Sequence, residues 1–259
     1  MALPARAAAE DGVSPVRQKQ SHTCIDAYAK YKPFETCSGC AGAGLGPLWP
    51  KVAEVWRTQQ LQATWLRNCL PGGPAFVPFW TVTQEALEVA LAAAGVDGSA
   101  PATGGEAGGV TIRERLLQLY KELEAYDDVA DVLSKAQAAG RRTAILSNGS
   151  KDMLGDAIRA ASLEDKLDAV ISADDAAVFK PDSRVYDLVC SSLGVRPEEV
   201  LFVSSNNWDV KGAAAYGFAT AWCNRKGSAG DAIPGSPDVV IESLVELAEA
   251  CAAQAAKPE

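Results

Sequence analysis

The sequence predicts an α/β protein with a doubly wound parallel sheet and a block of helices inserted after the first strand. Two observations predict this fold class. From about residue 127 onward, short apolar runs alternate with segments of helical periodicity, as in a parallel sheet whose strands are joined by helices. From 51 to 123, helical segments follow one another without an intervening strand. The helical block therefore interrupts the sheet-forming part of the chain.

The first predicted strand is short and ends at Asp26, and it contains few apolar residues. Turn-rich sequence follows it, and three helices are then predicted at 51–70, 83–94 and 111–123. The rest of the chain alternates between helices at 128–139, 151–161, 183–193, 211–216 and 243–253 and strands at 143–146, 169–172, 198–204, 218–223 and 239–241.

The strand at 143–146 is the clearest of these elements. Its apolar run changes abruptly to Ser147-Asn-Gly-Ser150, and such a run is typical of a strand buried on both faces. Ligands of open α/β sheets bind beyond the carboxyl ends of strands, so Ser147 and Asn148 are candidate site residues. The alternative is an ordinary turn with Ser150 as N-cap of the next helix.

This order predicts a disordered leader at 1–20, a Rossmann-like core domain at 21–46 and 124–259, and a helical cap domain at 47–123. The leader is rich in alanine but carries Glu10, Asp11, Arg17 and Lys19, so it lacks the apolar stretch of a secretory signal. We expect a cytoplasmic protein.

Composition narrows the function classes. The chain has 259 residues, a formal net charge of −9 and a pI near 4.8. Binding to a phosphate backbone needs a basic surface, so we expect no nucleic-acid partner. No apolar run approaches the roughly 18 residues of a membrane span, so we expect no membrane partner. A small anionic substrate remains compatible with a locally positive pocket.

Seven cysteines are scattered along the chain, and their odd number favours free thiols in a reducing compartment over a disulfide framework. Cys37 and Cys40 have the spacing of a metal-binding pair. A zinc site made with Cys24 and His22 is an alternative, but a second close cysteine pair is missing. We expect no metal.

Polar side chains from several strand ends are expected to converge at one sheet edge. The set comprises Asp26, Ser147, Asn148, Ser204, Asn206 and Asp209, with Lys180 from a loop and Arg57 from the helical block. A carboxylate beside cations, hydroxyls and amides suits covalent catalysis by aspartate. Asp209 as a helix N-cap and Arg57 as a solvated surface charge are the alternatives.

Four segments, in this order, resemble the haloacid dehalogenase superfamily, and most closely its (S)-2-haloacid dehalogenase (type II) branch. They are Leu146-Ser-Asn-Gly-Ser150, Val178-Phe-Lys-Pro-Asp-Ser-Arg-Val-Tyr186, Leu201-Phe-Val-Ser-Ser-Asn-Asn-Trp-Asp209 and Ala221-Trp-Cys-Asn-Arg225. Val55-Trp-Arg-Thr-Gln-Gln-Leu61 resembles the first cap helix of that branch. The resemblance covers roughly residues 45–250.

The resemblance implies an enzyme that converts (S)-2-haloalkanoic acids into (R)-2-hydroxy acids without metal or cofactor. Asp26 falls at the position of the nucleophile that forms an ester with C2 of the substrate. By the same resemblance, Arg57 and Asn148 receive the halide, Ser147 binds the substrate carboxylate, Lys180 keeps Asp26 ionised, and Ser204, Asn206 and Asp209 place the hydrolytic water and orient Lys180. A homodimer would fit the family.

The resemblance also implies an apolar wall around C2 made by Tyr28, Leu61, Phe79 and Trp208, and Tyr186 completes the site. Superfamily phosphatases carry a second aspartate where this chain has Tyr28, so phosphatase chemistry is disfavoured.

The first motif departs from the pattern Asp-x-Tyr-Gly-Thr, because Ala29 and Lys30 replace its Gly and Thr. The alternative function is therefore an inactive or repurposed member that binds small carboxylates or a protein partner.

Overall fold

The computed structural model describes residues 22–26, 44–70, 76–103, 109–122 and 124–247, with only the backbone described for 22–26. The expected leader at 1–20, the predicted site residue Tyr28, and the altered positions Ala29 and Lys30 lie outside these ranges. So do the side chains of the alternative zinc site, His22, Cys24, Cys37 and Cys40.

The core of the described structure is a six-stranded sheet in the order β3-β2-β1-β4-β5-β6, and every pairing is parallel. Its strands are β1 (His22–Asp26), β2 (Arg142–Ser147), β3 (Ala169–Ser172), β4 (Val200–Ser204), β5 (Ala219–Cys223) and β6 (Val239–Ile241). The strand order reverses direction at β1, which lies between β2 and β4. The predicted doubly wound parallel sheet is therefore confirmed.

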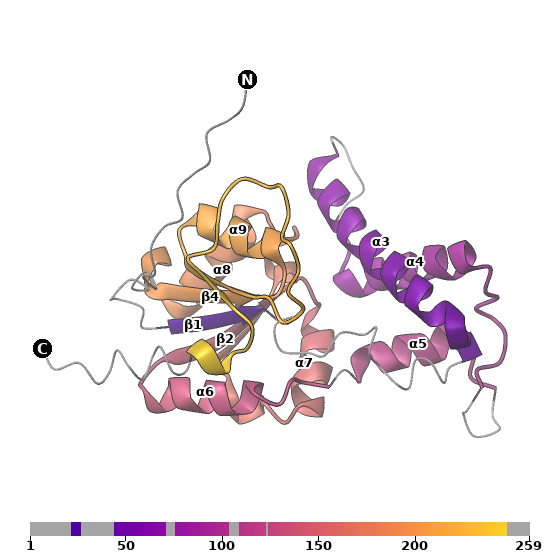
Figure 1. Cartoon of the computed structure of the whole chain (residues 1–259), viewed down its shortest axis with the longest axis horizontal. Helices are drawn as coiled ribbons and strands as arrows, with labels where there is room; N and C mark the ends of the chain where they lie inside the picture. The colour runs from indigo at the N-terminus through magenta and orange to yellow at the C-terminus, as the bar shows by residue number, and fades with distance from the viewer. Residues whose placement is uncertain (1–21, 27–43, 71–75, 104–108, 123, 248–259) are drawn as a thin grey trace, which may run out of the picture.

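Helices cover both faces of the sheet (Figure 1). On one face, α6 (Val129–Ala138) and α7 (Lys151–Ala160) pack through Leu133 and Leu154 against Ile145 and Val203. On the other face lie α8 (Ser183–Leu193) and α9 (Asn207–Tyr216). Short 3-10 turns at Glu164–Lys166, Ala173–Ala176 and Pro197–Glu199 complete the connections. Alternating strands and helices thus bury the sheet between two helical layers.

The inserted block contains a 3-10 turn (Gly46–Leu48), α3 (Trp49–Cys69), α4 (Phe79–Ala94) and α5 (Ile112–Lys121). These helices lie to one side of the sheet in Figure 1 and have their own apolar cluster, which includes Trp56, Leu87 and Leu116. The residues of α4 nearest the sheet, Phe79 and Val82, join instead the apolar cluster under α8. The insertion after β1 follows the expected order, and the domain boundaries remain a prediction.

Three predicted elements differ from the structure. Helix α4 begins at Phe79 rather than at residue 83, directly after Pro78. Helix α9 begins at Asn207 rather than at 211, so the expected polar loop at 204–209 contains the first helical turn. The expected helix at 243–253 begins at residue 245 rather than at 243, and its positions 248–253 lie outside the described residues.

None of the helices in the described ranges is both long and apolar enough to cross a membrane. Of the cysteines whose side chains are described, Cys69, Cys190 and Cys223 are free thiols.

Candidate active site

The turn after β2 presents Ser147 and Asn148 at the carboxyl edge of the sheet, and both side chains are buried. The amide N–H of Gly149 donates to Ser147 Oγ at 3.0 Å. Ser172, which ends β3, donates its hydroxyl to the carbonyl of Gly149 at 2.7 Å. Ser172 thereby supports this turn from the neighbouring strand. This role of Ser172 is not predictable from the sequence, because no recognisable motif contains it.

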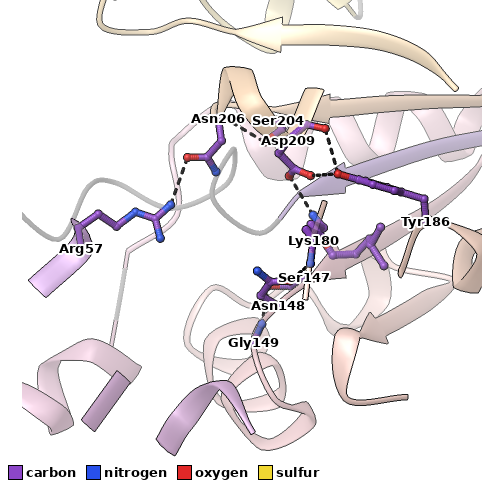
Figure 2. Close-up of polar contacts among 10 residues, drawn as sticks. Arg57, Ser147, Asn148, Gly149, Lys180, Tyr186, Ser204, Asn206 and Asp209 are labelled. Carbon is purple, nitrogen blue, oxygen red and sulfur yellow. Dashed lines mark hydrogen bonds and ion pairs between the residues drawn. The ribbon is translucent and has the colours of Figure 1, made fainter. Parts of the chain in front are cut away.

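Lys180 is the most buried cation of the site, with 2% of its side chain exposed. Its Nζ donates to the carbonyl of Leu146 at 2.9 Å and to Asp209 Oδ2 at 3.0 Å. Its backbone N–H donates to Asn148 Oδ1 at 2.9 Å. The side chain is therefore fixed between the end of β2 and α9, as Figure 2 shows.

Asp209 receives two donors through its two carboxylate oxygens. Lys180 binds Oδ2, and the buried Tyr186 hydroxyl donates to Oδ1 at 2.8 Å. Asp209 is the third residue of α9, whose N-cap is Asn206, so the alternative reading of Asp209 as an N-cap is wrong. A buried carboxylate with a lysine and a phenol as donors is held in one orientation.

Gly212, one turn after Asp209, allows this arrangement. A Cβ built on Gly212 would meet Tyr186 Oη at 2.5 Å and the Cβ of Pro181 at 2.8 Å. Real Cβ atoms do not approach other atoms so closely. The missing side chain therefore lets α9 approach Tyr186.

The backbone of β1 places Asp26 at the same edge. In the sheet register Asp26 pairs with Leu146, the residue whose carbonyl accepts from Lys180. The central position of β1, between β2 and β4, puts Asp26 between the two strand ends that carry the other polar groups. The side chain of Asp26 is outside the described structure.

Arg57 reaches the sheet edge from α3, opposite Lys180. Its Nη2 donates to Asn206 Oδ1 at 3.2 Å, and the N–H of Asn206 donates to Ser204 Oγ at 3.1 Å (Figure 2). This contact joins the inserted helices to the end of β4. The alternative reading of Arg57 as a fully solvated surface charge is therefore wrong.

These residues surround a cleft. Its described lining consists of Arg57, Leu61, Phe79, Asn148, Lys180, Asn206, Trp208 and Asp209. Arg57 and Lys180 are positive and Asp209 is negative, so the described lining has an excess of positive charge on a chain of net charge −9. Arg57 supplies a cation that can bind a small anion in this cleft.

Three further predicted residues of the described structure, Ser147, Tyr186 and Ser204, are not part of this lining. Ser147 and Ser204 are buried in the turns that carry Asn148 and Asn206, and Tyr186 touches Asp209 from within the core. Trp208 lies in the first turn of α9, where its ring meets that of Trp65 edge to face at 5.5 Å. The catalytic and substrate-binding roles of the whole set remain predictions.

Within the described ranges, no three histidine, cysteine, aspartate or glutamate side chains are grouped so that they could hold a metal ion.

Comparison with known proteins gives concordant results. A family model described as haloacid dehalogenase-like hydrolase matches residues 50–217. The (S)-2-haloacid dehalogenase 1 of Pseudomonas sp. (strain CBS-3) is 40% identical over 203 residues, which are 78% of this chain and 84% of that protein. The (S)-2-haloacid dehalogenase 4A of Burkholderia cepacia is 41% identical over 177 residues, 68% of this chain and 71% of that protein.

Among solved structures, the L-2-haloacid dehalogenase from Xanthobacter autotrophicus with chloropropionic acid covalently bound superposes with a TM-score of 0.75 at 32% identity. The match covers 89% of this chain and 97% of that one.

Proposed function

We propose that this chain, which belongs to the haloacid dehalogenase-like hydrolases, cleaves the carbon–halogen bond of (S)-2-haloalkanoic acids and yields (R)-2-hydroxy acids. One observation carries the proposal. The buried Lys180–Asp209 pair lies at the strand edge where Asp26 ends β1, and Arg57 faces it across the cleft. The curated relatives named above support the substrate class.

In the proposed first step, a carboxylate oxygen of Asp26 attacks C2 of the substrate from the side opposite the halogen. The new C–O bond forms as the C–halogen bond breaks, and the halide leaves with its electron pair. Lys180 provides positive charge beside Asp26, which favours the ionised nucleophile. The hydrogen bond from Lys180 to Leu146, the register partner of Asp26, supports this role.

The departing halide needs donors that can stabilise a full negative charge. Arg57 and Asn148 line the cleft and fill this role in the proposal. Ser147, in the turn beside Asn148, assists in binding the substrate carboxylate. Leu61, Phe79 and Trp208 supply apolar surface in the same lining. Desolvation by these side chains makes the Asp26 carboxylate more reactive. Tyr28 joins this wall in the proposal.

In the second step, water attacks the carbonyl carbon of the Asp26 ester, and the single bond from that carbon to the ester oxygen breaks. One proton of the water passes to the leaving oxygen and the other is released, so the hydroxy acid leaves and the Asp26 carboxylate is restored. Ser204, Asn206 and Asp209 place the water. Tyr186 holds Asp209 in position through its hydroxyl. Because attack is on the carbonyl carbon, one Asp26 oxygen is replaced by an oxygen from water in each turnover.

The test measures halide release from (S)-2-chloropropionate with EDTA present, for the wild type and for Asp26→Asn. We expect release by the wild type alone. A single turnover in ¹⁸O-labelled water should then place the label in the peptide that contains Asp26, and the product should carry unlabelled oxygen. Asp131→Asn, a matched change in an exposed ion pair on α6, should leave release unchanged.

A second candidate function follows from Ala29 and Lys30, which replace the Gly and Thr of the family's first motif. An inactive protein with this cleft would bind small carboxylates or a protein partner. Folded wild type that releases no halide but binds (S)-2-chloropropionate or lactate in calorimetry would support this alternative and contradict the dehalogenase proposal.

A further inference from the structure

Asn68 connects the inserted helices to the loop that carries the buried lysine. It lies in the last turn of α3, where its side chain reaches the backbone of Phe179. Asn68 Nδ2 donates to the carbonyl of Phe179 at 2.6 Å, and the N–H of Phe179 donates to Asn68 Oδ1 at 3.0 Å. One amide side chain therefore binds both backbone groups of a residue 111 positions away, and the Phe179 carbonyl also accepts from the N–H of Asp182 at 3.1 Å. We call this pair of hydrogen bonds the amide clasp.

The ring of Phe179 is held by the same helical block. It is fully buried, and its centroid lies 5.0 Å from that of Phe76 and 6.2 Å from that of Phe79. Phe76 lies in the segment that leads into α4, and Phe79 is the first residue of α4. Backbone and side chain of Phe179 are thus both fixed by residues inserted after β1.

The next residue along the chain is Lys180. Its N–H is bonded to Asn148 and its Nζ to Asp209 and Leu146. With the amide clasp on one side and Asn148 on the other, the peptide units around Lys180 have little freedom. A shift of Phe179 would move the Cα of Lys180 relative to Asp209.

We infer that Asn68 is a positioning residue. Through the amide clasp on Phe179 it holds the backbone of Lys180 where Nζ reaches Asp209, so the position of α3 and the Lys180–Asp209 ion pair depend on each other. The inference rests on the proposed function for its kinetic consequence. Asn68 does not line the described cleft, so it acts through Phe179 rather than on the substrate. Because α3 also carries Arg57, the same clasp fixes the distance between the two cations that face the substrate.

The variants separate the two bonds of the clasp. Asn68→Ala removes both, whereas Asn68→Asp keeps the acceptor for the Phe179 N–H and loses the donor. Arg67→Gln is the matched control, because Arg67 pairs with Glu85 inside the helical block and lies next to Asn68. All four proteins are compared at a temperature at which circular dichroism shows them folded.

Two readouts are taken from each protein. The first is amide hydrogen exchange at single-residue resolution for Phe179 and Lys180. The second is kcat and KM for halide release from (S)-2-chloropropionate. We expect Asn68→Ala to speed exchange at both residues about tenfold, the order expected for two ordinary hydrogen bonds. We expect kcat of Asn68→Ala to fall about tenfold while its KM changes less. The exchange rates and kcat of Asn68→Asp should lie between those of Asn68→Ala and the wild type, and Arg67→Gln should match the wild type.

Faster exchange at Phe179 alone, with kcat and the Lys180 amide unchanged, would overturn the inference, because the clasp would then be only a contact between helices. Unchanged exchange at Phe179 would overturn it as well. If the wild type releases no halide, the proposed function fails separately, and exchange at Lys180 decides the positioning role by itself.

Discussion

Lys180 and Asp209 form an ion pair almost without access to water, with 2% and 1% of their side chains exposed. Removing two charges from water is costly, and hydrogen bonds from Tyr186 to Asp209 and from Lys180 to Leu146 offset part of that cost. Breaking such a pair leaves the partner charge buried and uncompensated. Replacing one member of the pair is therefore expected to destabilise the protein more than replacing both with uncharged residues.

We predict that Asp209→Asn lowers the free energy of unfolding by about 3–5 kcal/mol, because Lys180 then lacks its anionic partner. Adding Lys180→Met to that variant should restore part of the stability while halide release stays lost. Urea unfolding measures both values. Asp131→Asn, in an exposed pair, should cost less than about 1 kcal/mol. A double variant no more stable than Asp209→Asn would contradict this account.

Two helical glycines give a matched test of close packing. Gly212→Ala places a methyl group against Tyr186 Oη and Pro181, so we predict a loss of about 1–3 kcal/mol and a lower kcat. Gly155 lies in α7, where an added Cβ would meet Arg159 Nη1 at an ordinary 3.4 Å. Gly155→Ala should therefore stabilise the protein by about 0.5–1 kcal/mol. Equal stability of the two variants in urea would show that α9 moves to make room.

At the scale of whole elements, α5 has the best-defined start. Thr111 Oγ1 accepts from the N–H of Glu114, and the Glu114 carboxylate accepts from the N–H of Thr111, which is a capping box. The donors on Thr111 hold the pKa of Glu114 below its usual range. The sequence Thr-Ile-Arg-Glu predicts this start correctly to within one residue.

We predict that Thr111→Ala destabilises the protein by about 1 kcal/mol at neutral pH, whereas Thr111→Ser retains the cap. A lowered carboxylate pKa contributes stability that is full above the pKa of the unfolded chain and is lost as pH falls through the folded one. The difference in free energy of unfolding between the wild type and Thr111→Ala should therefore become smaller in acid. Thermal unfolding at a series of pH values measures it, and a difference that grows on acidification would contradict the assignment.

The start of α9 is predicted four residues too late because its first turn is polar. Asn207, Trp208 and Asp209 resemble a loop, but the first turn of a helix has free backbone N–H groups and readily takes polar residues. Strand positions were predicted better, because a parallel strand buried on both faces must be apolar, as 143–146 is. The weak apolar content of β1 did not prevent its identification, since Asp26 could be placed by the motif order.

Some site residues can be predicted from the sequence and others cannot. Lys180, Asn148 and Asp209 stand in recognisable segments and were predicted to meet. Ser172, Asn68 and Gly212 were not, because each acts on a partner that only the folded chain brings near. Spacing along the chain carries no information about a contact such as Asn68 with Phe179.

At the scale of the whole molecule, Asp128 joins three distant segments. Its Oδ1 accepts from Nη2 of Arg225, a residue that follows β5, at 2.8 Å. Its Oδ2 accepts from the N–H of Leu244 at 2.9 Å. The Arg225 guanidinium lies 4.0 Å from the centroid of the Tyr126 ring. The chain leaving the helical block, the end of β5 and the C-terminal segment therefore meet at one carboxylate.

We predict that Asp128→Asn lowers the free energy of unfolding by about 1–3 kcal/mol, since it weakens bonds from a charged donor and from a backbone amide. The amide of Leu244 should also exchange faster with solvent. Urea unfolding and single-residue exchange measure these effects, and Asp131→Asn serves again as the control. Loss of stability without faster exchange at Leu244 would confine the role of Asp128 to Arg225.

The position of β1 has a consequence for how the protein is made. The ribosome delivers β1 first, yet its neighbours in the sheet begin at Arg142 and Val200. The nascent chain therefore carries β1 with both edges unpaired until Arg142–Ser147 has emerged, and with one edge unpaired until Val200–Ser204 follows. Such long-range pairing is slow, and open strand edges invite association with other chains. Chaperone capture during synthesis would act on the very segment that ends in Asp26.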